Sequence, residues 1–397
     1  MLSALFDIGL FGLITSTGAA LLALAGLARF LRQREPRPSA DFMPPVSLLK
    51  PLYGDEPGLE EHLETFFQQD YPGFEVLFCS RCPNDPALAI ARRVSARYPH
   101  ISTRFFCTGD DTWINAKVSS LELMAAAAQH DIFIISDSDV RVAPNYIREV
   151  VAPFASEKVG AVTCLYRGAA DRSLWSKLEA AGMSVEMTAG VLSASLLEGM
   201  KFALGPTMAV RRRAIQRMGG FQVLGPYCSD DFLLGSKVAS QGATVVLSHH
   251  VIDHIVLNLD LSASLQHQTR WMRSTRFSRP LGHLGMALTF SVPWGILACW
   301  AAWSLGRPGF GAALLAYSIV QRMILAAFTA SFAVHERHLL RSVVLYPLRD
   351  LLGFFCWVAS YAGSTIVWRG HRYRLTRGGL MHPVHAEPAR AESPLPT

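Results

Sequence analysis

The chain has 397 residues, of which 50% are hydrophobic and 17% are charged, and its formal net charge is +6. The apolar excess is atypical of a soluble enzyme and indicates membrane-embedded length. The basic excess suits an anionic membrane surface or a phosphorylated substrate. The absence of a G-x-x-x-x-G-K-[ST] sequence argues against a P-loop nucleotidase, and no G-x-G-x-x-G follows the first expected strand, which argues against a dinucleotide-binding domain.

The first element in chain order is an apolar stretch over residues 5–30 that is long enough to cross a bilayer. Its positive charges follow the stretch, beginning with Arg29 and Arg32, whereas a secretory signal would carry them in front. We therefore expect residues 1–34 to form a transmembrane anchor. The positive-inside rule places the N-terminus outside and residue 31 onward in the cytoplasm.

The next part, residues 42–280, is expected to be a water-soluble body in which short apolar strands alternate with helices. This alternation predicts an α/β fold with a mainly parallel sheet and helices on both of its faces. Ligands bind such sheets at the carboxyl ends of the strands. The expected strands are 46–52, 74–80, 101–106 and 131–136, and the expected helices between them are 57–70, 86–99 and 115–130.

Two carboxylates stand directly after the fourth expected strand. The sequence "DIFIISDSDV" ends an apolar run with Asp137 and Asp139 in a D-x-D pattern. Carboxylates placed at the carboxyl end of a parallel strand are oxygen ligands of the kind that Mg²⁺ or Mn²⁺ prefers. The alternative is a solvated turn, since Asp and Ser are common turn residues.

Further polar residues fall at the same expected edge of the sheet. Asp85 follows the second strand, where one carboxylate can hold a nucleobase, and Lys117 begins a helix, where its cation can neutralise a diphosphate. The alternative for each is a solvated loop side chain. The only close cysteine pair, Cys79 and Cys82, has no second pair to complete a zinc site.

The last part of the body carries two more motifs. Asp230 and Asp231 precede an amphipathic helix, where acidic residues also serve as ordinary caps. Arg270 and Trp271 end a polar helix ahead of the membrane, where they could equally be interfacial anchors. The weakly charged segment 173–205 is expected to be either a core helix or an interfacial helix that admits a lipid.

The C-terminal part, residues 281–370, is expected to consist of membrane helices. Segments 284–305 and 310–334 look like a hairpin of spanning helices, and a third segment covers about 343–368. Four crossings would place the basic stretch "WRGHRYRLTRGG" outside, against the positive-inside rule. We therefore expect one of these segments to lie in the interface or to re-enter, and residues 371–397 to form a basic and then disordered tail.

The order of these motifs resembles that of lipid-modifying glycosyltransferases with the GT-A fold, in the inverting family 2 and its relative family 21, which holds the ceramide glucosyltransferases. The resemblance covers about residues 10–380. The ceramide enzymes are similar in "SLLKPLYGDEPGLEEHLETFFQQDYPGFEVLFC" and "WRGHRYRLTRGG". The glycosyltransferases of bacterial hopanoid biosynthesis are similar in "VSLLKPLYGDEPGLE", "ISDSDVRV", "AVTCLYRG" and "SDDFLLG".

The resemblance assigns roles by position. Asp231 matches the general base, and Asp139 completes the metal-binding D-x-D pattern. His267 departs from the family pattern, which has Gln or Arg there. The positions that match the donor-binding pattern are Asp85, Asp137, Arg270 and Trp271. Together with Arg270, Lys117 would meet the charge of the leaving diphosphate.

These roles imply an inverting transfer of glucose or N-acetylglucosamine from a UDP-sugar to a membrane-lipid hydroxyl, with Mg²⁺ or Mn²⁺ as cofactor. A hopanoid is the expected acceptor and ceramide the alternative, and no nucleic-acid partner is expected. The expected location is a bacterial plasma membrane, with the body in the cytoplasm. A transporter would carry its ionisable residues in the spans, so the remaining non-enzyme alternative is a membrane-anchored module that binds a sugar nucleotide.

Overall fold

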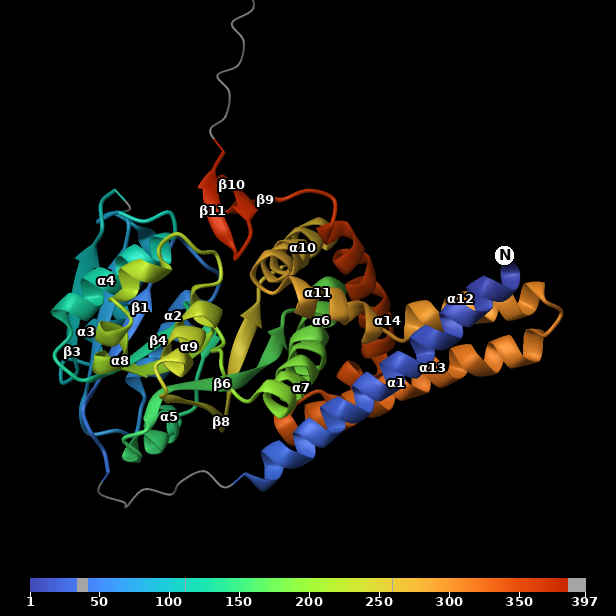
Figure 1. Cartoon of the computed structure of the whole chain (residues 1–397). Coiled ribbons are helices and arrows are strands. Elements are labelled where there is room, and N and C mark those ends of the chain that lie inside the picture. The colour runs from blue at the N-terminus through green and yellow to red at the C-terminus, as the bar shows by residue number, and fades with distance from the viewer. Residues whose placement is uncertain (34–41, 111, 259, 385–397) are drawn as a thin grey trace, which may run out of the picture.

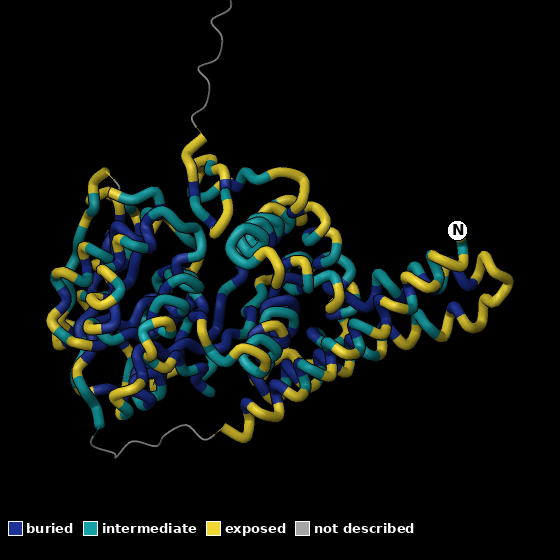
Figure 2. Tube along the Cα trace, viewed as in Figure 1, coloured by how far each residue is buried: buried dark blue, intermediate teal, exposed yellow. Residues whose placement is uncertain are grey.

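A computed structural model describes residues 1–33, 42–110, 112–258 and 260–384. It shows an α/β body, a set of long helices that extends away from it, and a small C-terminal sheet that lies over the body (Figure 1). The interior of the body is buried, while the extending helices expose residues along much of their length (Figure 2). The α/β class with a mainly parallel sheet and N- and C-terminal apolar helices is confirmed.

The body is built on an eight-stranded sheet with the order β3-β2-β1-β4-β7-β6-β8-β5. Strands β1, β2, β3 and β4 pair in parallel, as do β6 and β8, whereas β7 and β5 pair antiparallel with their neighbours. The strands are β1 (Val46–Pro51), β2 (Phe74–Ser80), β3 (Ser102–Cys107), β4 (Ile132–Ser136), β5 (Val140–Arg141), β6 (Val159–Ala170), β7 (Thr207–Arg211) and β8 (Thr244–Val256).

Helices cover both faces of this sheet because successive strand residues point to opposite sides. Leu48 packs with α2, α3 and α5 on one face, and Leu49 packs with α4, α8 and α9 on the other. The helices of the body are α2 (Leu59–Phe67), α3 (Pro86–Ala96), α4 (Ala116–Ala127), α5 (Tyr146–Val151), α8 (Arg212–Arg217), α9 (Asp230–Ser240) and α10 (Leu261–Ser278). Short 3₁₀ turns lie at Ala152–Ala155 and Phe221–Leu224.

The extending helices pack closely through small residues. A Cβ atom on Gly12 would lie 2.2 Å from the ring of Trp294, and one on Gly9 would lie 2.8 Å from the backbone of Ala298. Small residues let membrane helices approach in this way. The elements are α1 (Leu2–Arg32), α11 (Pro280–Gly285), a 3₁₀ turn (Met286–Leu288), α12 (Val292–Ser304), α13 (Pro308–Phe328), a π-helical turn (Thr329–Ala333) and α14 (Leu339–Ser360).

The described part of the chain contains four helices that are long and apolar enough to cross a membrane. Three are α1, α13 with its π-helical end, and α14, and the fourth is Leu174–Glu198. The expected spanning segment 284–305 is bent, because α11 with its 3₁₀ turn meets α12 at an angle of 44°. Among the described C-terminal apolar segments, this bent pair has the shape of a broken span or a re-entrant loop.

Three other expected boundaries need correction. Within segment 173–205 the helix covers only Leu174–Glu198, and it contains a π-helical turn, Gly182–Met187, between α6 (Leu174–Ala181) and α7 (Thr188–Glu198). The last apolar helix ends at Ser360 instead of near 368. Beyond it lies strand β9 (Thr365–Trp368), which was expected to be part of the last membrane segment. The expected basic tail forms strands β10 (His371–Thr376) and β11 (Leu380–Pro383), while the expected disordered part, 385–397, lies outside the described residues.

Candidate active site

The D-x-D segment lies in the loop between β4 and β5, at the carboxyl end of β4 as expected. The backbone N–H of Asp137 donates to Pro206, across the gap to the antiparallel strand β7. The buried Lys50 on β1 donates through Nζ to the Asp137 carbonyl at 2.6 Å. Burial lowers the pKa of Lys50 to about 7, although Asp137 and Asp139 partly oppose this effect. The loop is therefore fixed from two neighbouring strands.

Lys117 connects the D-x-D loop to the start of α9. Its Nζ lies 2.6 Å from Asp137 Oδ1 and 3.8 Å from Asp230 Oδ2. The capping residue Asn115 starts α4 and donates to Asp230 at 3.2 Å. Burial lowers the pKa of Lys117, but Asp137 and Asp230 outweigh it, so the pKa is raised and the ammonium stays charged. A fixed cation thus stands between two of the candidate carboxylates.

Asp139 faces His254 on β8. The two are 3.0 Å apart, from Oδ2 to Nε2, because β5 and β8 pair at this point. The second oxygen of Asp139, Oδ1, is buried and has no hydrogen-bond partner among the described residues. Burial raises the pKa of Asp139, but the neighbouring His254 more than offsets this and brings the pKa to about 2. The carboxylate is therefore ionised at neutral pH, and one of its oxygens has no hydrogen-bond partner among the described residues.

The two aspartates of the S-D-D sequence begin α9 and differ in their surroundings. Asp230 is 7% exposed and bonds to Asn115, whereas Asp231 is half-buried beside Gly205. A Cβ atom on Gly205 would lie 3.0 Å from Asp231 Oδ2, so the glycine leaves room for this carboxylate. Burial, and after it the charge of Asp230, raises the pKa of Asp231 to about 6. A carboxylate with such a pKa is suited to accept a proton near neutral pH.

Arg270 and Trp271 lie in the middle of α10, not at its end as the sequence indicated. Arg270 forms no hydrogen bond or ion pair with any described residue, although it is half-buried, and burial lowers its pKa. The ring of Trp271 lies 4.5 Å from that of His267 and 6.3 Å from that of His254. A guanidinium without a partner among the described residues, which experiences the charge of Asp139, is an available site for an anion.

Asp85 is held by backbone groups. It caps α3 by accepting from Ala87 N–H at 2.9 Å, and it also accepts from Gly54 N–H at 3.0 Å in the loop after β1. Within the described residues it bonds to none of the other candidate side chains. Asp85 is therefore a helix cap and not the solvated loop side chain of the alternative reading, and the same bonds fix the β1–α2 loop at the carboxyl edge of the sheet.

Sequence reasoning missed several groups at this site. His254 and Glu179 reach it only through long-range packing, and Glu179 Oε1 on α6 lies 2.6 Å from His267 Nδ1. Glu56 lies near Ser138, and burial raises its pKa. Lys50 had a usable signal, because a lysine inside an apolar strand requires a partner. No comparable signal marked the other three.

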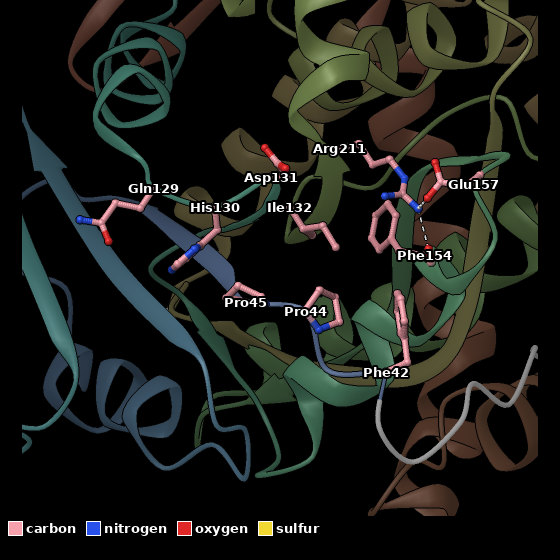
Figure 3. Close-up of a pocket in the computed structure, with 10 residues that line it drawn as sticks. All are labelled: Phe42, Pro44, Pro45, Gln129, His130, Asp131, Ile132, Phe154, Glu157 and Arg211. Atoms are coloured by element: carbon pink, nitrogen blue, oxygen red, sulfur yellow. Dashed lines mark hydrogen bonds and ion pairs between the residues drawn. The ribbon is translucent and has the colours of Figure 1, made fainter.

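A separate pocket of about 310 Å³ lies at the opposite edge of the sheet (Figure 3). It is lined by Pro45 before β1, by Ile132 at the start of β4 and by Arg211, whose guanidinium turns to the Phe154 carbonyl. These are the amino ends of the parallel strands. The pocket is therefore far from the groups described above and contains none of them.

The sequence matches the family model "Glycosyl transferase family 21" over residues 10–381. The chain belongs to glycosyl transferase family 21. It is therefore a glycosyltransferase, as the sequence predicted. The match spans the anchor, the body, the C-terminal helices and most of the C-terminal sheet.

Two curated relatives agree with the family, and a solved structure shares the fold. Ceramide glucosyltransferase 1 of Caenorhabditis elegans is 23% identical over 350 residues, which cover 87% of this chain and 74% of the relative. Ceramide glucosyltransferase 3 of the same organism is 23% identical and covers 86% and 75%. The fold is similar to that of a mannosyltransferase of Pyrobaculum calidifontis solved with GDP-Man and Mn²⁺, with a TM-score of 0.57, 19% identity and coverage of 90% of this chain and 99% of that chain.

Proposed function

We propose that this glycosyltransferase moves glucose or N-acetylglucosamine from a UDP-sugar to a hydroxyl group of a membrane lipid, with inversion at the anomeric carbon. The observation that carries the proposal is the arrangement at the carboxyl edge of the sheet. Four charged side chains lie in this region: Arg270, Asp139, Lys117 and Asp231. Among the described residues, Arg270 has no partner, and one oxygen of the ionised Asp139 has none. The body that carries them is joined to apolar helices. A nucleoside diphosphate would supply negative charge to the two cations, a metal ion would bind the carboxylate oxygens, and the acceptor hydroxyl would supply the proton that Asp231 accepts.

The donor diphosphate and a divalent ion fit this arrangement. Asp137 and Asp139 would hold Mg²⁺ or Mn²⁺ through carboxylate oxygens, and the hydrogen bond between His254 and Asp139 would orient the second of these carboxylates. Within the described residues no group of three or more His, Cys, Asp or Glu side chains forms a complete metal site, so phosphate oxygens and water would complete the coordination. The bound ion would neutralise charge on the leaving diphosphate. Arg270 and Lys117 would act as fixed cations, and the mannosyltransferase solved with GDP-Man and Mn²⁺ supports this type of donor site.

Asp231 is the proposed general base. A lipid hydroxyl is a weak nucleophile, and a carboxylate within hydrogen-bond reach can take its proton as it attacks. Asp231 lies in the half-buried position beside Gly205, whereas Asp230 is engaged by Asn115 and Lys117. Direct attack opposite the leaving diphosphate on an α-linked sugar nucleotide would give a β-linked product.

Ceramide and hopanoid acceptors are supported by different observations. The names of the two nematode relatives support ceramide. The sequence resemblance noted in "ISDSDVRV" and "SDDFLLG" supports a hopanoid polyol. Either lipid could approach along α6 and α7, an apolar segment whose Glu179 contacts His267 on the helix that carries Arg270.

We further propose that the protein lies in a bacterial plasma membrane with its body in the cytoplasm, where UDP-sugars are made. The arginines at the end of α1 support this orientation. Protease added to intact cells should leave residues 42–280 uncut, and cleavage within that range would reverse the proposed topology. A tag after Thr397 would locate the C-terminus in the same assay.

The deciding experiment for the reaction is incubation of the purified, detergent-solubilised chain with labelled UDP-glucose or UDP-N-acetylglucosamine. Ceramide and bacteriohopanetetrol are offered separately, and lipid products are identified by mass spectrometry. A hexosylated lipid with release of UDP supports the proposal, and the productive pair identifies donor and acceptor. Release of UDP without a lipid product would contradict the lipid acceptor, and binding of the donor without any turnover would favour the binding-module alternative.

A further inference from the structure

The C-terminal sheet, formed by β9, β10 and β11, has a small apolar core of its own. Ile366, Leu375 and Met381 are each at most 3% exposed. They pack with Phe277 on α10 and Cys228 in the loop before α9. The sheet is therefore a folded part of the catalytic body, joined to the membrane helix α14 by a short connection (Figure 1).

Hydrogen bonds fasten this sheet to two elements that carry candidate site residues. On α10, Arg273 donates to the Thr365 carbonyl at 2.7 Å, three residues after Arg270. In the loop before α9, Cys228 N–H donates to Gly379 and Met381 N–H donates to Pro226, at 3.0 and 2.8 Å. Movement of the sheet relative to Arg270 and Asp231 is thus restricted, and the free end of its β9–β10 hairpin is held over the body.

The tip of that hairpin reaches a third site element, the loop after β1. The Arg369 guanidinium lies 4.8 Å from the centre of the Tyr53 ring. Tyr53 is 44% exposed and precedes Gly54, whose N–H bonds to Asp85. The pKa of the neighbouring Glu56 is raised by burial and by the charges of Asp139 and Asp137, whereas the charge of Arg369 lowers it.

The conformation of the tip is unfavourable for the residue that occupies it. Arg369 has φ of 49° and Gly370 has φ of 79°, so both central residues of this two-residue hairpin lie in the left-handed region. Asn, Asp and Gly are the residues preferred there, and an arginine costs on the order of 1 kcal/mol relative to them. Arg369 forms no ion pair with any described residue. The turn itself therefore does not explain why arginine occupies this position.

We propose that Arg369 is a further donor-binding residue, and that the C-terminal sheet closes the nucleoside end of the donor site opposite Tyr53. A planar aromatic ring faced by a planar cation can bind a nucleoside diphosphate, because the ring stacks on the base and the guanidinium pairs with phosphate. This inference rests on the proposed function, in particular on a UDP-sugar donor. It assigns to the last folded segment of the chain a direct contact with the donor.

The test is the affinity for UDP with Mg²⁺, measured by titration calorimetry on the full-length protein. Arg369→Asn removes the cation but keeps a residue that favours the left-handed turn, so the hairpin should remain folded. Arg377→Asn removes an exposed cation from the same sheet and is the matched control. We expect Arg369→Asn to weaken UDP binding about tenfold or more and to raise the KM for the UDP-sugar, while kcat and the KM for the lipid change little.

The outcomes separate this inference from the proposed function. Unchanged UDP affinity in Arg369→Asn, with normal binding by the wild type, would overturn the donor-binding role and leave the proposed function standing. Equal weakening in Arg377→Asn would also overturn it, since a general charge effect would then explain the loss. Failure of the wild-type protein to bind any uridine nucleotide would overturn the proposed function itself. Arg369→Lys, which keeps the charge but not the planar group, should retain an intermediate affinity.

Discussion

The catalytic body and the membrane helices both contain buried or partly buried charged groups, but these groups differ in whether they have partners within the protein. Between the helices, Arg322 on α13 lies 3.4 Å from Asp350 on α14, and Asp350 also accepts from the N–H groups of Ser291 and Val292 at the start of α12. In the body, Arg270 has no partner among the described residues, and one oxygen of Asp139 has none.

Burying a charge costs several kcal/mol unless partners compensate it, so the difference distinguishes structural groups from functional ones. The Arg322–Asp350 pair is internally satisfied and joins three helices, which is a structural role. The groups in the body remain incompletely satisfied, and ligands would complete them. The comparison therefore assigns stability to the first set and donor binding and chemistry to the second.

The largest effect is expected from Asp231→Asn. This change removes the proton acceptor but keeps the shape, and loss of a general base costs about 10²–10⁴-fold in rate. UDP affinity and melting temperature should be nearly unchanged, because the diphosphate contacts lie elsewhere. UDP release with lipid acceptor present is the measurement, and Asp230→Asn is the control, with a smaller expected loss. If Asp231→Asn keeps near-normal turnover while Asp230→Asn has none, Asp230 is the general base and Asp231 is not.

Breaking the charge pair between the helices should affect stability first. Asp350→Ala leaves Arg322 buried without its partner and the α12 N–H groups without an acceptor, which should destabilise the fold by about 3–5 kcal/mol. Asp350→Asn keeps an acceptor and should lose less. Thermal unfolding in detergent measures both. If Asp350→Ala has normal stability and loses donor binding, the division between structural and functional charges is wrong.

Asp139→Asn should reduce turnover about a hundredfold, because it removes a charged ligand from a proposed metal–diphosphate site. The protein should stay folded, as shown by an unchanged melting temperature. Excess chelator applied to the wild-type protein should produce a loss of similar size that added Mg²⁺ or Mn²⁺ restores. Full activity in the chelator would exclude the metal role of the D-x-D pair.

The smallest of these effects is on the pH profile. Since burial raises the pKa of Asp231 to about 6, the carboxylate is the basic form only above that pH. The apparent kcat/KM should therefore fall about tenfold per pH unit below pH 6 and level off above it. The residual activity of Asp231→Asn should lack this acidic limb. If the variant shows the same fall in kcat/KM below pH 6, a group other than Asp231 causes that fall.

The body was largely predictable from sequence because its apolar runs have strand length and are separated by amphipathic stretches. The expected strand 74–80 agrees with β2 at both ends. Adjacent helix residues such as Arg349 and Asp350 do not face each other, and the structure shows Arg349 at 2.9 Å from Glu186 and Asp350 near Arg322. Their partners could not be predicted, because helix packing between distant segments determines them.

The site was only partly predictable, for the same reason. Asp137 and Asp139 are local to one strand end, whereas His254 reaches Asp139 through strand pairing across 115 residues of sequence. The C-terminal sheet was missed because its strands alternate basic and aromatic residues and bury few apolar side chains. Leu375 becomes core only where the sheet packs on α10 and on the loop before α9.

The most direct test of the central claim, that the unpartnered charges of the body hold a sugar nucleotide, is the affinity of Arg270→Ala for UDP with Mg²⁺. Removing a half-buried cation from a diphosphate should weaken binding by about a hundredfold, while the melting temperature stays the same or rises because a partly desolvated charge without a protein partner is lost. UDP affinity equal to that of the wild type, or a large loss of stability, would contradict the claim and make Arg270 a structural residue.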